Sequence, residues 1–321
     1  MTALTGQTQG GALPAVSVAR QPSDGSGSEA GGTTGPPEIL GRYTHLTDPG
    51  SILVSGWNRS GENSLALTVH WPPVTGERPY DPRVLAQTVR QSGLVVAHAE
   101  YGVPLDHQTV LSFLDFTIPD RLPPGGGKAA RLDVDVLVSP AGDTGRARRS
   151  LRMCFLLRHE GVTIARADSE FGWIPPRVYR RLRGDRMPAV WGAWELPEPL
   201  DPARVGRADA GGVLLSPTGE PNRWRLRNDV SDTALFDHPV DHVPGLVLVE
   251  AADQAAHAVL GPRAFRAGEI ATRYFRYVDF DRPCLIEART LPAEPGRFAL
   301  AVDGTQDAEV AFSTVLRGPA D

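Results

Sequence analysis

The stretch that says most about the fold is Leu246-Val-Leu-Val-Glu-Ala-Ala-Asp-Gln-Ala-Ala-His-Ala-Val-Leu260. Wound as a helix, it is apolar on almost every side, apart from Glu250, Asp253, Gln254 and His257. Such a helix must be enclosed by other elements. A second helix-length stretch, Val84 to Ala99, is also rich in apolar residues. The sequence therefore predicts two buried helices.

The segments around these helices read as strands. Apolar and polar residues alternate with period two in Ser64 to His70, Ala130 to Val138, Arg152 to Leu157 and Phe298 to Val302. Alternation leaves one face of a sheet in water, which favours an antiparallel sheet. We predict an α+β fold in which each unit is a long helix enclosed by a curved antiparallel sheet.

The two helices belong to a sequence repeat. Gln87-Thr-Val-Arg-Gln91 lies 163 residues before Glu250-Ala-Ala-Asp-Gln254. After each helix we expect a strand that ends in Asp-Phe, at Leu114 to Phe116 and at Val278 to Phe280, with an offset of 164. Similar order and spacing indicate a duplicated unit.

Composition divides the chain further. Residues 1–37 are mostly Gly, Ser, Thr, Ala and Pro, and are expected to stay unfolded. The predicted domains are residues 38–183 and 216–321. Repeated prolines and the pair Gly211-Gly212 predict a linker over residues 184–215.

Net charge and composition exclude some classes of protein. Net charge is −5 and no helix-turn-helix is recognisable, so we expect no nucleic-acid partner. Apolar runs are too short for a membrane helix. No basic region followed by an apolar stretch marks a secretion signal, so a cytoplasmic protein is expected. Cys154 and Cys284 are expected to be free thiols.

Several motifs resemble the A-factor biosynthesis proteins of actinomycetes, which make γ-butyrolactone signalling molecules, over roughly residues 38–318. In the first half these are Tyr80-Asp-Pro82, Thr88-Val-Arg-Gln91, His98-Ala-Glu-Tyr-Gly-Val-Pro104 and Pro176-Arg-Val-Tyr-Arg-Arg-Leu-Arg-Gly-Asp185. In the second half they are Val213-Leu-Leu-Ser216, Trp224-Arg-Leu-Arg227, Leu235-Phe236, Asp241-His-Val-Pro-Gly245, Glu250-Ala251 and Arg273-Tyr-Phe-Arg-Tyr-Val-Asp-Phe-Asp-Arg-Pro-Cys284.

The resemblance implies a double hotdog fold and an acyltransferase without a cofactor. Such an enzyme joins a β-ketoacyl thioester, carried by acyl carrier protein or coenzyme A, to dihydroxyacetone phosphate, and ring closure then gives a butenolide phosphate. A shorter likeness, Asp241 to Ala256, is to the acyl-carrier-protein dehydratases. Hotdog units pair, and because the pair lies within one chain, we expect a monomer.

Acyl transfer to a hydroxyl needs a base and a positive group where oxyanion charge develops. Glu250 is the candidate base, since an apolar helix raises a carboxyl pKa, and His242 faces the helix start. Backbone N–H groups after Gly245 are candidate donors to the thioester oxygen or a phosphate. Arg273 and Arg276, or Arg90 from the other copy, are candidate phosphate ligands.

Other interpretations stay open. Glu250 alternatively caps its helix, and His242 alternatively bonds a loop carbonyl. His238 and His242 have a metal-like spacing, but Pro239 prevents helical presentation and no third ligand is evident, so no metal is expected.

The family helices usually carry Glu-x-x-Arg-Gln, whereas this chain has Gln87 with Arg90 and Glu250 with Asp253. We expect Gln87 and Asp253 to lie in the substrate site. Asp253 should raise the pKa of one carboxyl and disfavour a phosphate there. Three hypotheses follow: an active acyltransferase, a hotdog dehydratase or thioesterase, or a non-catalytic regulatory paralogue.

Overall fold

The computed structural model describes residues 36–73, 80–120, 127–140, 150–186, 190–262 and 266–319. The expected unfolded tail lies outside these residues, apart from Pro36 and Pro37, where the first helix begins. The description below concerns the compact unit that starts at Gly32.

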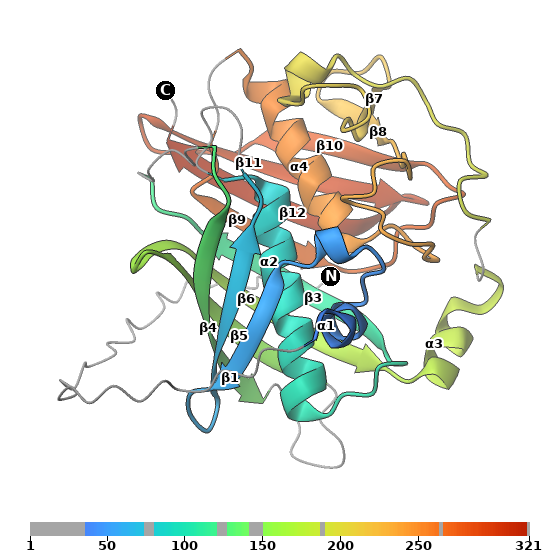
Figure 1. Ribbon diagram of the computed structural model, residues 1–321. Helices are drawn as coiled ribbons and strands as arrows, with labels where there is room; N and C mark the ends of the chain where they lie inside the picture. Colours follow the sequence, from blue (N-terminus) through green and yellow to red (C-terminus); the bar gives the residue numbers. More distant parts are fainter. Residues whose placement is uncertain are drawn as a thin grey trace, which may run out of the picture. The chain divides into compact units, whose positions relative to one another are not determined.

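The described residues of the first half form three α-helices and six strands, arranged as in Figure 1. The helices are α1 (Pro37–Thr44), α2 (Pro82–Val95) and α3 (Pro176–Arg183), and α2 continues as the π-helical turn η2 (Val96–Glu100). The strands are β1 (Val54–Arg59), β2 (Ser64–Trp71), β3 (Gln108–Thr117), β4 (Ala130–Pro140), β5 (Ser150–His159) and β6 (Val162–Ile174). Short 3-10 turns are η1 (Pro49–Ser51) and η3 (Gly184–Arg186).

The second half repeats this plan with one long helix, α4 (Gly245–Leu260). Its strands are β7 (Leu215–Pro217), β8 (Arg223–Leu226), β9 (Glu269–Tyr274), β10 (Cys284–Thr290), β11 (Arg297–Gln306) and β12 (Glu309–Pro319), and the 3-10 turn η4 (Pro202–Val205) precedes them. The expected helices and the expected strands are therefore confirmed within a few residues at their ends, except the strand expected over Val278 to Phe280.

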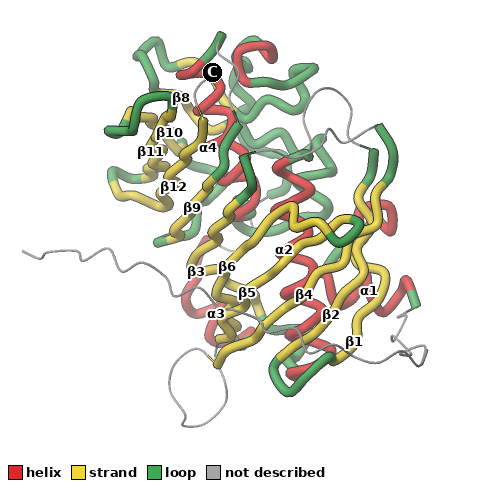
Figure 2. Tube along the Cα trace, turned by 90° about the vertical axis from the view of Figure 1, so that its left-hand side faces the viewer, coloured by secondary structure: helices red, strands yellow, loops and turns green. Residues whose placement is uncertain are grey.

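The strands form one antiparallel sheet in the order β1-β2-β4-β5-β6-β3-β9-β12-β11-β10-β8-β7. Read outward from the centre, both halves have the same order of equivalent strands. The halves meet where β3 pairs with β9, from Phe113 opposite Arg273 to Thr117 opposite Glu269. Figures 1 and 2 show α2 and α4 on the same face of this sheet.

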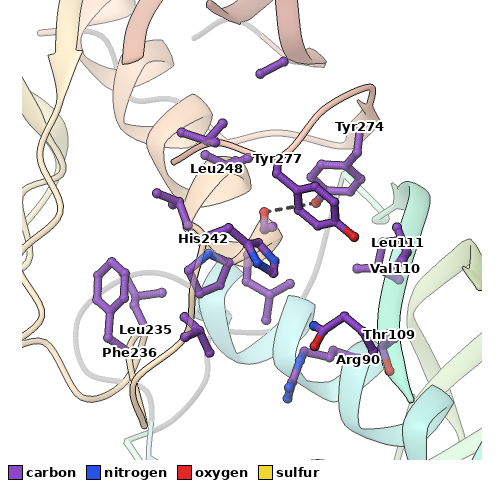
Figure 3. A pocket seen from close by; sticks show the side chains of 18 of the residues that line it. Arg90, Thr109, Val110, Leu111, Leu235, Phe236, His242, Leu248, Tyr274 and Tyr277 are labelled. Atoms are coloured by element: carbon purple, nitrogen blue, oxygen red, sulfur yellow. Dashed lines mark hydrogen bonds between the residues drawn. The ribbon is translucent and has the colours of Figure 1, made fainter. Parts of the chain in front are cut away.

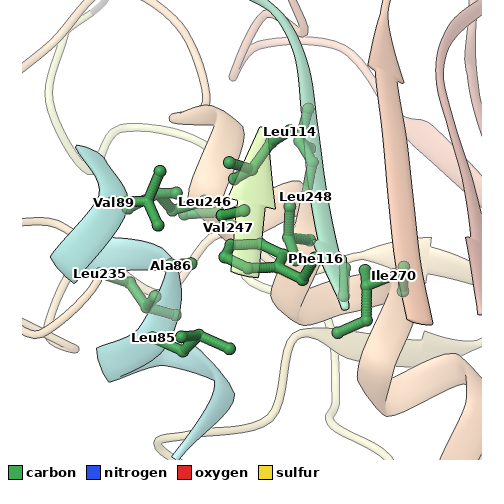
Figure 4. Close-up of a cluster of buried hydrophobic side chains, with 14 of the residues drawn as sticks. Leu85, Ala86, Val89, Leu114, Phe116, Leu235, Leu246, Val247, Leu248 and Ile270 are labelled. Carbon is green, nitrogen blue, oxygen red and sulfur yellow. The ribbon is translucent and has the colours of Figure 1, made fainter. Parts of the chain in front are cut away.

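The core lies between these helices and the central strands. Period-two burial along β2 and β6 turns alternate side chains toward the helices. In Figure 4, Val89 of α2 lies beside Leu246 of α4, with Leu114, Phe116 and Ile270 on the sheet side. No helix within the described ranges combines the length and apolar character needed to cross a bilayer. Cys154 and Cys284 are both free.

A matching pair of glutamines confirms the duplication at atomic detail. The Gln91 amide accepts from Leu53 N (2.7 Å) and donates to Ser51 O (2.9 Å). The Gln254 amide accepts from Leu214 N (2.8 Å) and donates to Gly212 O (2.8 Å). Each glutamine thus ties its helix to the segment before the first strand of its own copy.

Two details differ from the sequence prediction. The second Asp-Phe pair does not end a strand, because β9 ends at Tyr274 and Asp279 N donates to the Gln306 side chain instead of a neighbouring strand. Residues 190–215 of the expected linker also pack on the second copy. Their apolar members Leu200, Val205, Val213 and Leu214 are buried, which is why the segment is held there.

Candidate active site

A cavity of about 600 Å³ lies between the two copies. The first copy contributes Gln87 and Arg90 of α2, the start of β3 and the segment that follows α1. The second copy contributes residues 233–246, the end of β9 and the loop after it. Figure 3 shows Arg90 and Thr109 on one side, with His242, Leu248 and Tyr277 facing them. Apolar wall residues include Val110, Leu111, Phe171, Leu235, Phe236 and Leu248.

His242 presents one ring nitrogen to this cavity. Its Nδ1 lies 2.8 Å from Asp241 Oδ1, so the carboxylate, which can only accept, holds the proton on Nδ1. Nε2 of the neutral ring is then left as an acceptor. The ring also packs edge-on against Tyr277, with 4.6 Å between centroids. An oriented imidazole of this kind is suited to act as a general base.

Asp241 is held by helix α3 of the first copy. The Tyr179 hydroxyl donates to both carboxylate oxygens at 2.8 Å, and Arg183 Nε donates to Oδ2 at 2.8 Å. Arg183 is buried and also pairs with Asp279 at 2.7 Å. Burial raises the pKa of Asp241, but hydrogen bonds with His242, Tyr179 and Arg183 outweigh burial and lower it well below its usual range. The carboxylate therefore stays charged.

Arg90 is the cavity arginine whose charge is least compensated. The other arginines that line the cavity, Arg183, Arg186, Arg276 and Arg282, all form ion pairs. Arg90 forms none with any described residue and donates to the carbonyl oxygen of Thr44 (3.1 Å). Burial lowers its pKa to about 10, although the charge of Asp237 opposes this. An anionic ligand would supply the missing charge.

Two further polar groups in the cavity have buried atoms with no hydrogen-bond partner in the part of the chain that the structure describes. They are Gln87 Oε1 and the Tyr277 hydroxyl. Burial raises the pKa of Tyr277, so its hydroxyl keeps the proton and can donate. A buried polar atom without a partner costs free energy, and a bound ligand can satisfy it.

Gly245 begins α4 at the cavity wall. The Tyr274 hydroxyl donates to its carbonyl oxygen at 3.0 Å, the bond drawn in Figure 3. A Cβ on Gly245 would lie 3.2 Å from the Tyr274 ring, so this close approach favours glycine. The start of α4 therefore reaches the cavity, as the candidate role of Gly245 requires.

Glu250 and Asp253 lie elsewhere. Both are buried, and neither is among the described residues that line the cavity with His242. Arg207 Nε donates to Glu250 Oε1 at 2.7 Å, and its guanidinium also reaches Asp253 at 3.5 Å. The Gln254 amide donates to the same Glu250 oxygen at 2.6 Å. Burial raises the pKa of Glu250, the Arg207 charge lowers it, and Asp253 raises it again, with a net upward shift.

The two candidate arginines of the second copy are placed differently. Arg273 points to the opposite face of β9 from Tyr274, because side chains alternate along a strand. It pairs there with Asp115 (2.9 Å) and does not line the cavity. Arg276 lines the cavity, is exposed and donates to Glu309 at 2.9 Å.

Sequence reasoning missed several residues around this site. Arg207 lies in the expected linker, where nothing local marks it, although two acids on an apolar helix require a nearby cation. In the sequence, Tyr179 and Arg183 lie within a family motif. Their spacing of four places both on one helix face, which could have indicated a common target. Asp241 precedes His242 directly and could have been proposed as its partner.

The fold and cavity define a double hotdog protein, with two helix-in-sheet units in one chain and a site between them. In agreement, the 12:0-ACP thioesterase from Umbellularia californica has the same fold with a TM-score of 0.53 at 11% identity, over 80% of this chain and 94% of that one. This chain belongs to the A-factor biosynthesis hotdog domain family, whose sequence profile matches residues 33–175 and 193–311. The expected family and fold are thus confirmed.

Its relatives include two synthases of known name. The chain is 39% identical over 287 residues to the 2-oxo-3-(phosphooxy)propyl 3-oxoalkanoate synthase of Streptomyces virginiae, covering 86% of this chain and 97% of the relative. It is 35% identical to the synthase of the same name from Streptomyces coelicolor, covering 86% and 90%.

Proposed function

We propose that this protein is an acyltransferase that joins a β-ketoacyl thioester to dihydroxyacetone phosphate, as a step in making a butenolide or γ-butyrolactone signal. The names of its relatives describe such an ester of a 3-oxoalkanoic acid. The observation that carries the proposal is one cavity that is shared by the Asp241-bound His242 and by Arg90, which forms no ion pair with any described residue. One group can take a proton, and the other can hold a phosphate.

In the proposed reaction, His242 Nε2 takes the proton of the substrate hydroxyl. The hydroxyl oxygen attacks the thioester carbonyl and forms the new C–O bond, which gives a tetrahedral oxyanion. Collapse of this oxyanion breaks the C–S bond. The departing thiolate then receives the proton from His242. Asp241 stabilises the positive imidazolium between these transfers and keeps the ring in place.

Other cavity groups would position the two substrates. The Tyr277 hydroxyl is a donor for the developing oxyanion, and Gln87 Oε1 is an acceptor for a hydrogen bond from the substrate, which needs no charge on Gln87. Arg90 would hold the phosphate. Phe171, Leu235 and Leu248 offer an apolar wall for the acyl chain.

Glu250 would have a different task. Glu250 occupies the position in the second copy that Gln87 occupies in the first, and there it pairs with Arg207. We expect it to stabilise the fold, and the catalytic role considered from the sequence is tested directly below. Arg273 would likewise stabilise the fold, through its ion pair with Asp115.

The proposal also covers the thioester carrier, the oligomeric state and the cellular compartment. The acyl group would arrive on acyl carrier protein or coenzyme A, and the protein would work as a monomer, since the paired units lie within one chain. Both proposed substrates are metabolites of the cytoplasm, which is where we place the reaction.

The direct test is to incubate the pure protein with a β-ketoacyl thioester and dihydroxyacetone phosphate and to follow products by mass spectrometry. Acylated triose phosphate is expected, and it should be absent with His242→Asn. Loss of thioester without this product would instead identify a thioesterase or dehydratase. No reaction, with the thioester still bound, would identify a non-catalytic paralogue.

A further inference from the structure

His45 and His98 form a hydrogen-bonded pair at the edge of the cavity. Their Nε2 atoms lie 2.9 Å apart, and His98 Nδ1 lies 2.8 Å from the carbonyl oxygen of Val103. A carbonyl oxygen can only accept, so His98 carries its proton on Nδ1. Burial lowers the pKa of His98, although the Val103 carbonyl opposes this, and the ring is neutral near pH 7. Its Nε2 is therefore an acceptor.

The proton between the rings must then belong to His45. With Nε2 protonated, the neutral His45 ring has its lone pair on Nδ1. Burial lowers the pKa of His45 to about 4, with further lowering by His98 and Arg90, so the ring stays neutral. The structure gives Nδ1 no hydrogen-bond partner among the described residues, and His45 lines the cavity. A bare acceptor therefore lies at the cavity wall.

The backbone of His45 is unusual for a side chain of this size. It ends α1 in the left-handed region, with φ 55° and ψ 39°. In the second copy, Gly206 ends η4 in the same region, with φ 67° and ψ 33°. Glycine adopts this conformation without the strain that a Cβ introduces. A histidine at a position where the second copy has glycine points to a use for its side chain.

Arg90 lies next to His45. Its guanidinium donates to the carbonyl oxygen of Thr44, the residue before His45. The unpaired cation and the bare acceptor thus lie side by side on one wall. A ligand that satisfies both must carry an anion and a hydrogen-bond donor a few atoms apart.

We propose that His45, held in one tautomer by His98, is a positioning residue: before the thioester enters, it accepts a hydrogen bond from the hydroxyl of the phosphate ester bound at Arg90. The hydroxyl turns from His45 to His242 when its proton is transferred. This inference rests on the proposed function and adds a substrate preference to it. The cavity selects a hydroxylated phosphate ester over one that has the phosphate alone.

The test compares dissociation constants for dihydroxyacetone phosphate and hydroxyacetone phosphate, which lacks the hydroxyl. Calorimetry on the whole protein needs no turnover. Wild type should bind the hydroxylated ester about tenfold more tightly, the worth of one good hydrogen bond. His45→Gly should lose this preference, while its affinity for inorganic phosphate stays unchanged. His45→Asn, which tolerates the left-handed backbone and keeps an acceptor oxygen, should restore the preference to within about threefold.

Stability separates this role from a structural one. His45→Gly relieves the backbone, so its melting temperature should stay within about 3 °C of wild type. His70→Asn, an exposed change on β2, is the control. Equal binding of both esters by wild type, or an unchanged preference in His45→Gly, would overturn the inference. A wild type that shows the preference but makes no acylated product would remove the proposed reaction and leave the role of His45 standing.

Discussion

Arg90 and His242 line the same cavity although they belong to different copies of the repeat. Arg90 comes from α2 of the first copy, whereas His242 precedes α4 of the second. The pairing of β3 with β9 joins the copies and brings the two residues to one space. The candidate site is therefore a product of the duplication, and neither copy alone contains it.

Removing the Arg90 charge should weaken binding of the phosphate substrate. Arg90→Ala should raise KM for dihydroxyacetone phosphate about 30- to 100-fold, because a charged hydrogen bond is lost. Arg90→Lys should have a smaller effect, about tenfold, since it keeps the charge without the planar fork. Steady-state kinetics at saturating thioester measure this. Arg289→Ala, an exposed change on β10, is the control, and an unaltered KM in Arg90→Ala would contradict the assignment.

Neutralising Asp241 should slow catalysis more than it weakens binding. Asp241→Asn removes the charge that stabilises the His242 imidazolium and disturbs its tautomer, so kcat should fall at least about 100-fold. Tyr179→Phe removes one of several bonds to Asp241 and should lower kcat less, by under about tenfold. A large rise in KM with unchanged kcat for Asp241→Asn would show that this carboxylate is not part of the proton transfer.

Loss of Arg207 should destabilise the fold. Arg207→Ala removes the guanidinium that pairs with the buried Glu250 and Asp253, which costs about 3–5 kcal/mol in unfolding free energy. Urea unfolding followed by circular dichroism measures the change. The triple variant Arg207→Leu, Glu250→Gln, Asp253→Asn carries no buried charge at these positions. It should lose less unfolding free energy than Arg207→Ala. A stability loss below about 1 kcal/mol in Arg207→Ala would contradict this account.

Stability should fall in acid partly because of Asp241. Its folded pKa is lowered, so the unfolded chain binds a proton first as pH falls below the unfolded value of about 3.9. The stabilisation from Asp241 is thus complete above about pH 5 and is lost progressively at lower pH. Wild-type urea midpoints should change little between pH 6 and 4.5 and fall between pH 4.5 and 3.5. Asp241→Asn should start lower and fall less; a parallel decline would assign the loss to other carboxyls.

The fold was predictable because its signals are local. The apolar helix from Leu246 to Leu260 and the alternating strands such as Ser64 to His70 carry their own periodicity. The sequence repeat also indicated that the two copies of the unit pair with each other. The Val278 to Phe280 segment was expected as a strand and is not one, because Asp279 N donates to the side chain of Gln306, which lies far along the chain.

The candidate site was less predictable because side-chain direction depends on tertiary packing. Glu250 and His242 lie close in sequence, yet Glu250 turns to Arg207 while His242 faces Arg90 and Gln87. From the sequence, Asp253 was expected to disfavour a phosphate, because no cation near it was visible. The distant Arg207 supplies that cation, and a Pro- and Gly-rich segment gives no periodic signal for it.

One comparison tests the central claim most directly, namely that His242 rather than Glu250 serves the reaction. Acylated triose phosphate formed by His242→Asn and by Glu250→Gln should be measured side by side, per mole of folded protein. We expect His242→Asn to lose about 100-fold or more, and Glu250→Gln to retain at least about half of the wild-type rate. A Glu250→Gln variant without activity beside an active His242→Asn would contradict the account.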